Sequence, residues 1–148
     1  MDASAPRRPA RRVVAAVLLA GVIAAGLVVH ALLPDTTATD IAGDALYAVA
    51  AYLAVVIVAP RLAPLTVGAI AAVWCVLVEL FQLTGIPLAL GAVFPPAMLA
   101  LGTVFDGRDL LVYLLTIVVL VGADAVVTLP RRAAEPEPAR AEESTTPS

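Results

Sequence analysis

Charged side chains are scarce in this sequence of 148 residues: they make up 14% of it, whereas a typical soluble domain has about a quarter. Apolar residues account for 61%. A single folded unit of this length leaves much of its surface in contact with solvent, so one core could not bury so much apolar surface. The composition therefore excludes an ordinary soluble domain and predicts that a lipid bilayer solvates the excess.

Cysteine, histidine and lysine are also nearly or completely missing. The single cysteine, Cys75, cannot form an internal disulfide. All nine basic residues are arginines and no long basic run occurs, so we expect no nucleic-acid partner. Without a Cys pair or a His-x-x-x-His motif, the sequence predicts no metal site. It contains no Ser-His-Asp spacing and no glycine-rich phosphate loop, so no cofactor is expected, and the absence of a strong nucleophile counts against an enzyme.

What the sequence does contain is a series of apolar runs, each about as long as the 20 residues that cross hydrocarbon as a helix. They predict an all-α integral membrane four-helix bundle, with one membrane domain over residues 13–129. The first run could instead be a cleaved signal peptide, but its apolar region is longer than such peptides have. A basic segment, 1–12, precedes this domain, and the tail 130–148 is predicted to be disordered and cytoplasmic. The predicted spans are about 13–33, 41–59, 65–83 and 110–129.

The segment 86–105 is uncharged and long enough to span, but Pro95 and Pro96 stand at its centre. The second proline removes a helix hydrogen bond and clashes with the preceding turn, so we expect two short helical pieces. A fifth span would move Arg131 and Arg132 outside, so the positive-inside rule favours four spans. Both termini would then be cytoplasmic at the cell membrane, and the broken segment would be a re-entrant hairpin or an interfacial element on the outer side.

Several polar side chains lie within the predicted spans, where a charge is expensive and usually faces other helices or water. The alternating direction of the spans brings most of them to one depth near the outer face, which predicts an outward-facing binding pocket. Asp124, near the inner end of the last span, and His30 have no assigned role. The candidate binding residues are Asp44, Tyr47, Glu79, Gln82, Arg108, Asp109 and Tyr113.

These candidates also have simpler interpretations. Glu79 and Gln82 are three residues apart on one helix face and could hold helices together by hydrogen bonds. Asp44 and Asp109 stand near the start of their spans and could serve as helix caps. If the carboxylates do converge, they repel one another unless a proton, a cation or Arg108 neutralises them.

The order of several short motifs resembles a known family. The motifs are Gly-Asp-Ala-Leu-Tyr at 43–47, Glu-Leu-Phe-Gln at 79–82, Leu-Gly-Thr-Val-Phe at 101–105 and Asp-Leu-Leu-Val-Tyr at 109–113. Their order is similar to that of the small bacterial membrane proteins grouped as domain of unknown function (DUF) 2809, a group that is itself similar to the VanZ-like family. The resemblance covers roughly residues 40–125. It implies four spans and an outward-facing polar site.

The resemblance does not carry an activity with it. VanZ-like proteins usually have an arginine in the loop after the Glu-x-x-Gln motif, and the loop 84–98 has none. We therefore do not expect the glycopeptide-resistance role of the name-giving protein. Three functions stay open: a pocket that binds an envelope lipid or amphiphile, an enzyme or proton-coupled transporter that uses Glu79 and Asp109, and a structural membrane subunit. The sequence predicts no oligomeric state.

Overall fold

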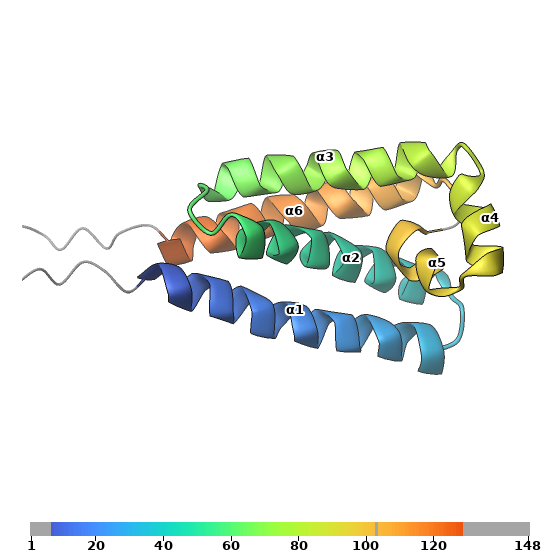
Figure 1. Cartoon of the computed structure of the whole chain (residues 1–148), viewed down its shortest axis with the longest axis horizontal. Helices are drawn as coiled ribbons and strands as arrows, with labels where there is room; N and C mark the ends of the chain where they lie inside the picture. The colour runs from blue at the N-terminus through green and yellow to red at the C-terminus, as the bar shows by residue number, and fades with distance from the viewer. Residues whose placement is uncertain (1–6, 103, 129–148) are drawn as a thin grey trace, which may run out of the picture.

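The protein is described by a computed structural model over residues 7–102 and 104–128. The predicted disordered tail, 130–148, lies outside the described residues. Four of the helices, α1, α2, α3 and α6, are long and apolar enough to cross a membrane. The all-α architecture expected from the sequence is confirmed (Figure 1). The helices are α1 (Arg7–Leu32), α2 (Thr37–Val58), α3 (Pro64–Gln82), α4 (Ile86–Val93), α5 (Pro96–Leu101) and α6 (Gly107–Thr128).

Helix α2 begins at Thr37, before the apolar run that was predicted to start at about residue 41. The reason is a capping box: the Thr36 hydroxyl accepts the Thr39 backbone N–H at 3.3 Å, and the Thr39 hydroxyl accepts the Thr36 N–H at 2.9 Å. These bonds satisfy donors that a helix start leaves free. Asp44 therefore lies in the second turn of α2, and the prediction that it could cap the helix is wrong.

The proline pair splits the segment after α3 into two short helices, as predicted. Helix α4 ends at Val93, and α5 begins at Pro96. Phe94 between them has a non-helical backbone (φ −134°, ψ 86°), as expected because a following proline disfavours the helical region. The two short helices lie together at one end of the bundle (Figure 1), which we call the α4/α5 end.

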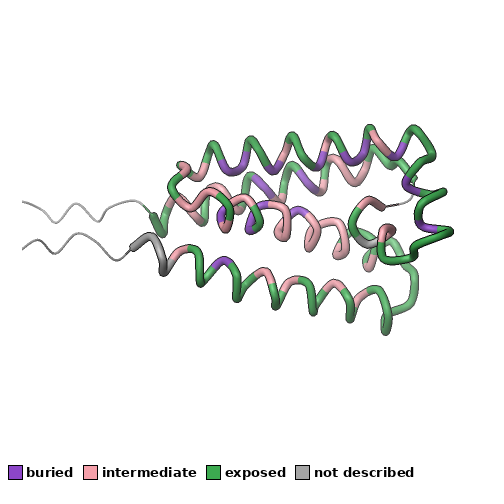
Figure 2. The backbone as a smooth tube through the Cα atoms, in the orientation of Figure 1, coloured by how far each residue is buried: buried purple, intermediate pink, exposed green. Residues whose placement is uncertain are grey.

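Helices α2, α3 and α6 form the core of the bundle. Buried residues recur along each of these helices (Figure 2). The outer faces of α3 and α6 carry exposed large apolar side chains. Gly68 allows α3 to approach α6 closely, because a Cβ at this position would overlap the Val121 side chain. Exposed apolar side chains such as Leu77 and Val118 are those that a lipid bilayer would solvate. The core residues include Ala48, Tyr52, Val56, Val67, Ala71, Cys75, Tyr113 and Ile117.

Helix α1 packs along α2 at the edge of the bundle (Figure 1). At its first turns it is also tied to α6. Arg11 donates to the backbone oxygens of Pro60 and Leu62 at 2.8 and 3.0 Å and pairs with Asp124 at 2.5 Å. Tyr52 donates to the same Asp124 oxygen at 2.8 Å. This cluster, which we call the Arg11 clamp, joins α1, α2, the α2–α3 loop and α6 at the end of the bundle opposite α4 and α5.

Candidate binding site

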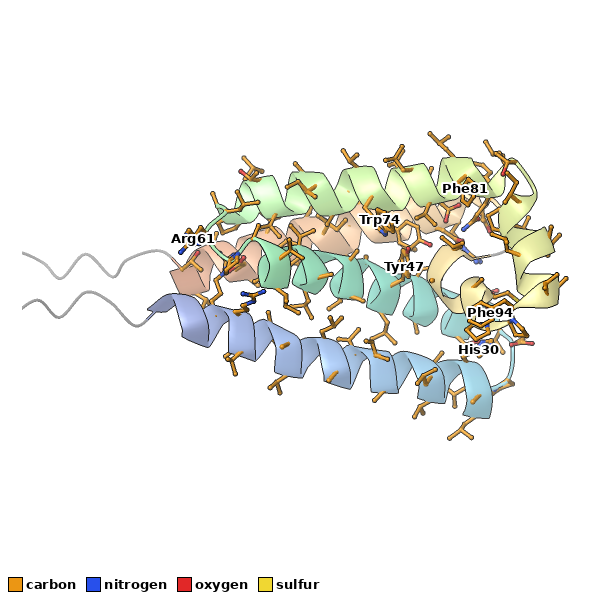
Figure 3. All side chains as sticks on the ribbon, viewed as in Figure 1. His30, Tyr47, Arg61, Trp74, Phe81 and Phe94 are labelled. Carbon is orange, nitrogen blue, oxygen red and sulfur yellow. The ribbon has the colours of Figure 1, made fainter. Side chains whose placement is uncertain are left out.

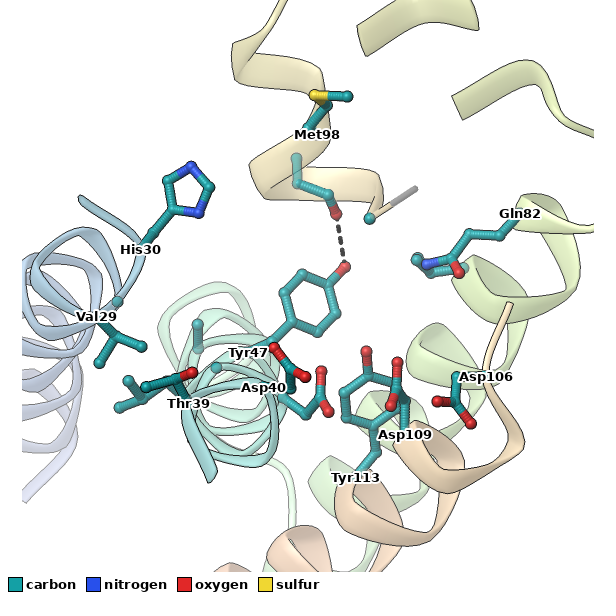
Figure 4. A pocket seen from close by; sticks show the side chains of 18 of the residues that line it. Val29, His30, Thr39, Asp40, Tyr47, Gln82, Met98, Asp106, Asp109 and Tyr113 are labelled. Carbon is teal, nitrogen blue, oxygen red and sulfur yellow. Dashed lines mark hydrogen bonds between the residues drawn. The ribbon is translucent and has the colours of Figure 1, made fainter. Parts of the chain in front are cut away.

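A cavity of about 710 Å³ lies between α1 and the rest of the bundle, at the α4/α5 end. Residues of α1, α2, α3, α5 and α6 line it (Figure 4). Its volume falls in the range of small-molecule sites, about 300–1,000 Å³. Five carboxylates and one guanidinium line the end that is closest to the helix termini: Asp35, Asp40, Asp44, Asp106, Asp109 and Arg108.

The cavity becomes apolar as it runs deeper into the bundle. Along α1 its lining extends from His30 back to Val22, which is roughly 12 Å at 1.5 Å per residue. In this deeper part the wall of α1 consists of Val22, Ile23, Gly26 and Leu27. The space is therefore polar at the α4/α5 end and apolar toward the middle of the predicted spans.

Helix α2 presents four polar side chains to the cavity, those of Thr39, Asp40, Asp44 and Tyr47. Asp40, Asp44 and Tyr47 are four and three residues apart, so they lie on one helix face. The Tyr47 hydroxyl donates to the Ala100 backbone oxygen at 2.8 Å (Figure 4). It also accepts a hydrogen bond from Nε1 of Trp74 at 3.1 Å. The Trp74 side chain is half exposed. It anchors Tyr47 and, through Tyr47, the end of α5.

Helix α6 begins with a cap that leaves Asp109 available. The Asp106 carboxylate accepts the backbone N–H of Arg108 at 2.8 Å, so Asp106 takes the capping role that the sequence had suggested for Asp109. Asp109 and Tyr113 are one turn apart on the face of α6 that lines the cavity. The Arg108 guanidinium lies 3.7 Å from the carboxylates of Asp106 and Asp109, and 3.9 Å from that of Asp40.

Glu79 is completely buried behind the cavity and is not among the residues that line it. Its carboxylate accepts a hydrogen bond from the Tyr113 hydroxyl at 3.1 Å and one from the backbone N–H of Asp106 at 3.3 Å. A longer contact, 3.5 Å, joins it to Nε2 of Gln82. Glu79 thus faces the bundle, as its depth predicted, and it fixes the position of three cavity-lining residues.

Gln82 extends from the last turn of α3 toward the segment after α5. Its amide nitrogen donates to the Leu101 backbone oxygen at 2.9 Å. The next residue, Gly102, has φ +65° and ψ −166°, a conformation that is essentially restricted to glycine. A Cβ on Gly102 would also overlap the Gln82 amide. Glycine is therefore required where this backbone passes over Gln82.

Buried polar atoms without a partner are concentrated in this cavity. In the part of the chain that the structure describes, four buried side-chain nitrogen or oxygen atoms make no hydrogen bond. Most buried polar groups in proteins are paired, so such atoms require an explanation. All four belong to residues that line the cavity: Asp44 Oδ2, Gln82 Oε1, Asp109 Oδ1 and Arg108 Nε.

The structure brings the sequence-predicted candidates together, although not in equal roles. Six of them line the cavity, and Glu79 lies directly behind it. Asp35, Asp40 and Asp106 were not predicted to take part. The sequence feature that could have identified them is their position beside the predicted spans, close to the candidates at 44 and 109. The six candidates in the lining are Asp44, Tyr47, Gln82, Arg108, Asp109 and Tyr113.

The four apolar helices define a small multi-pass membrane protein, and the comparisons with known proteins add its family. A family model described as "Protein of unknown function (DUF2809)" matches residues 33–117, which include α2 to α5 and the first half of α6. The chain belongs to this family. No curated protein and no solved structure matches it. The further likeness to VanZ-like proteins stays a prediction.

Proposed function

We propose that this protein binds an amphiphile of the cell envelope, such as a membrane lipid, in the cavity at the α4/α5 end. The observation that carries the proposal is the change in the cavity along its length. Carboxylates, an arginine and tyrosines surround one end, and the aliphatic side chains of α1 line the deeper part. A space of this kind fits a molecule with a polar head and an apolar tail.

The distribution of arginines supports an outward-facing cavity. Arg11 and Arg12 near the start of α1 lie at the same end of the bundle as Arg61, which is in the α2–α3 loop (Figure 3). Arg108 lies at the other end, between acidic side chains. Because loops rich in arginine stay in the cytoplasm, we infer that both termini are cytoplasmic and that the α4/α5 end faces outward across the cell membrane.

The competing functions find less support in the geometry. An enzyme or a proton-coupled transporter that uses Glu79 and Asp109 requires both groups to reach a substrate or water. Glu79 is fully buried, and each of its oxygens accepts a hydrogen bond from within the protein. A purely structural role would not explain why four buried polar atoms of the cavity-lining residues make no hydrogen bond.

The experiment compares two glycine substitutions on the same helix. Gly26 lines the cavity, Gly21 faces away from the bundle core, and a Cβ at either position meets nothing within 4 Å. Gly26→Phe therefore places an aromatic ring in the cavity, whereas Gly21→Phe places one toward lipid and serves as the matched control. Phenylalanine is preferred to tryptophan because it brings no N–H that would need a partner at this depth.

The purified protein and both variants are incubated in detergent with phosphatidylethanolamine, phosphatidylcholine and phosphatidylglycerol that carry identical acyl chains. Native mass spectrometry then counts the lipids that each protein retains. We expect the unmodified protein and Gly21→Phe to retain one lipid, and Gly26→Phe to lose it. Equal retention by all three proteins, or by none of them, would contradict binding in this cavity.

A further inference from the structure

The four unpartnered atoms around the cavity are not a random mixture of donors and acceptors. Three are oxygens that can only accept: Asp44 Oδ2, Asp109 Oδ1 and Gln82 Oε1. The fourth, Arg108 Nε, can only donate. Asp109 Oδ1 lies 3.7 Å from the Arg108 guanidinium, an ion pair that is too long for a hydrogen bond. A partner that completes the pattern supplies N–H or O–H donors and, beside them, an acceptor.

Gln82 gives this pattern its strongest support. The residue is only 6% exposed, and its amide nitrogen is already engaged by the Leu101 backbone oxygen. This bond fixes which end of the amide is nitrogen, because the Leu101 oxygen can only accept. Gln82 lines the cavity, and its amide oxygen therefore has no hydrogen-bond donor within the described part of the protein.

A proton shared between the two aspartates would explain only part of the pattern. Asp44 and Asp109 both line the cavity and interact with each other, so one proton between them could satisfy an oxygen of each. It would leave Gln82 Oε1 and Arg108 Nε unpartnered. All four atoms belong to residues of one cavity lining, so a single group bound there accounts for more of the observations.

The charges around the cavity limit what this group can be. The five carboxylates of the lining outnumber the single guanidinium, so the cavity favours a head group that carries positive charge. An inorganic cation is a weaker match, because no cluster of three or more histidine, cysteine or acidic side chains among the described residues is arranged to hold a metal ion. A primary ammonium carries the charge and also three donors.

We infer that the amphiphile carries a primary ammonium group beside an anionic oxygen, as the phosphoethanolamine head group of an aminophospholipid does. This inference rests on the proposed function. The ammonium donates to Asp44, Asp109 and Gln82, and the phosphate accepts from Nε of Arg108. A quaternary ammonium has the same charge but no N–H, so it leaves the three oxygens unpartnered. A glycerol head group has donors but no positive charge.

The test is the head-group preference of the retained lipid in the same mass-spectrometric experiment. We expect phosphatidylethanolamine to be retained over phosphatidylcholine by at least about tenfold, since the loss of a single charge-assisted hydrogen bond already corresponds to that factor. Phosphatidylglycerol should be retained least. If Gly26→Phe abolishes retention but the three lipids are retained equally, the head-group inference is wrong and the proposed function stands. If retention never depends on Gly26, the proposed function itself fails.

Two variants separate the two halves of the head group. Asp44→Asn removes a negative charge and replaces a carboxylate, which can only accept, by an amide that also donates. We therefore expect the preference for phosphatidylethanolamine over phosphatidylcholine to disappear. If a shared proton were the whole explanation, the unmodified protein would show no head-group preference. A preference that persists unchanged in Asp44→Asn would show that Asp44 does not contact the ammonium. Either result would overturn the inference.

Arg108→Gln tests the phosphate contact, with dodecylamine as a probe that has an ammonium and a chain but no phosphate. We expect this variant to lose phosphatidylethanolamine and to keep or gain dodecylamine, because removing Arg108 leaves the carboxylates less neutralised. Arg61→Gln, at the opposite end of the bundle, is the control and should change neither. Equal loss of both probes by Arg108→Gln, or no loss of either, would overturn the phosphate assignment.

Discussion

The hydroxyl of Tyr113 on α6 donates a hydrogen bond of 3.1 Å to Oε1 of Glu79 on α3. Tyr113 lines the cavity, whereas the Glu79 side chain is completely buried behind it. The ring of Tyr113 also packs against that of Tyr47 on α2, with 5.8 Å between the ring centroids. One tyrosine thus links α2, α3 and α6 at the depth of the candidate site, and Glu79 holds it in place.

We expect Glu79→Gln to destabilise the protein by about 1–3 kcal/mol, the cost of leaving a buried donor unpaired. All the partners of Glu79 donate to it, so the amide nitrogen of glutamine would face another donor. Glu79→Ala removes both acceptor oxygens and should cost more. The measurement is reversible unfolding in a sodium dodecyl sulfate titration, followed by the fluorescence of Trp74.

Retention of lipid by Glu79→Gln in its folded state distinguishes a structural role from a direct one. Because Glu79 is not in the cavity lining, we expect the folded variant to retain the same lipids with the same head-group preference. A variant that stays as stable as the unmodified protein yet loses the lipid would show that Glu79 acts in binding directly.

The Arg11 clamp should contribute measurably to stability, because the side chains of Arg11 and Asp124 are only 20% and 16% exposed. We expect Arg11→Gln and Asp124→Asn each to cost about 1–3 kcal/mol in the same titration. The double variant should cost less than the sum of the two, since both single changes remove the same ion pair.

Arg12→Gln is the matched control for the clamp. Arg12 is the exposed neighbour of Arg11 and contributes equally to the basic segment that orients the first helix. We expect its replacement to change stability by less than about 0.5 kcal/mol. If Arg11→Gln were no more destabilising than Arg12→Gln, the clamp would contribute nothing and α1 would be held by its packing on α2 alone.

Gly102→Ala and Gly107→Ala form a second matched pair. At Gly102 we expect a cost of about 1–3 kcal/mol, because the backbone lies in a region that is essentially restricted to glycine. The new Cβ would also push the Gln82 amide away from the Leu101 oxygen. At Gly107, the first residue of α6, a Cβ meets nothing within 4 Å, and alanine should be neutral or slightly stabilising. Thermal unfolding in detergent measures the stability of both variants. A greater loss of stability in Gly107→Ala than in Gly102→Ala would contradict the prediction.

The orientation in the membrane can be read with reporter fusions. We expect a fluorescent protein that matures only in the cytoplasm to be bright at either terminus, because the arginines gather at that end of the bundle. A phosphatase that is active only outside should be active when it is inserted between Leu33 and Thr36. An active phosphatase at the C-terminus would refute the four-span orientation and, with it, the outward-facing cavity.

Much of the fold and part of the candidate site could be predicted from the sequence. The apolar runs indicated the spans, and the proline pair indicated the break between α4 and α5, because both depend on local chemistry. Depth along each span brought Asp44, Gln82 and Asp109 to one level. The cap at Thr36 was missed, since a helix starts where its free N–H groups are satisfied and not where hydrocarbon begins.

Taken by itself, the sequence determined that the chain crosses a membrane, since the length and composition of an apolar run decide whether it can span. It also determined which polar residues share a depth, because a helix rises by a constant amount per residue. Only the tertiary structure decided which of them face a common space, because that depends on how each helix is rotated and packed. The packing buried Glu79 behind Tyr113 and left acceptors of Asp44, Asp109 and Gln82 unpaired around the cavity. It also joined Arg11 to Asp124, which are 113 residues apart, a pairing that no local pattern in the sequence encodes.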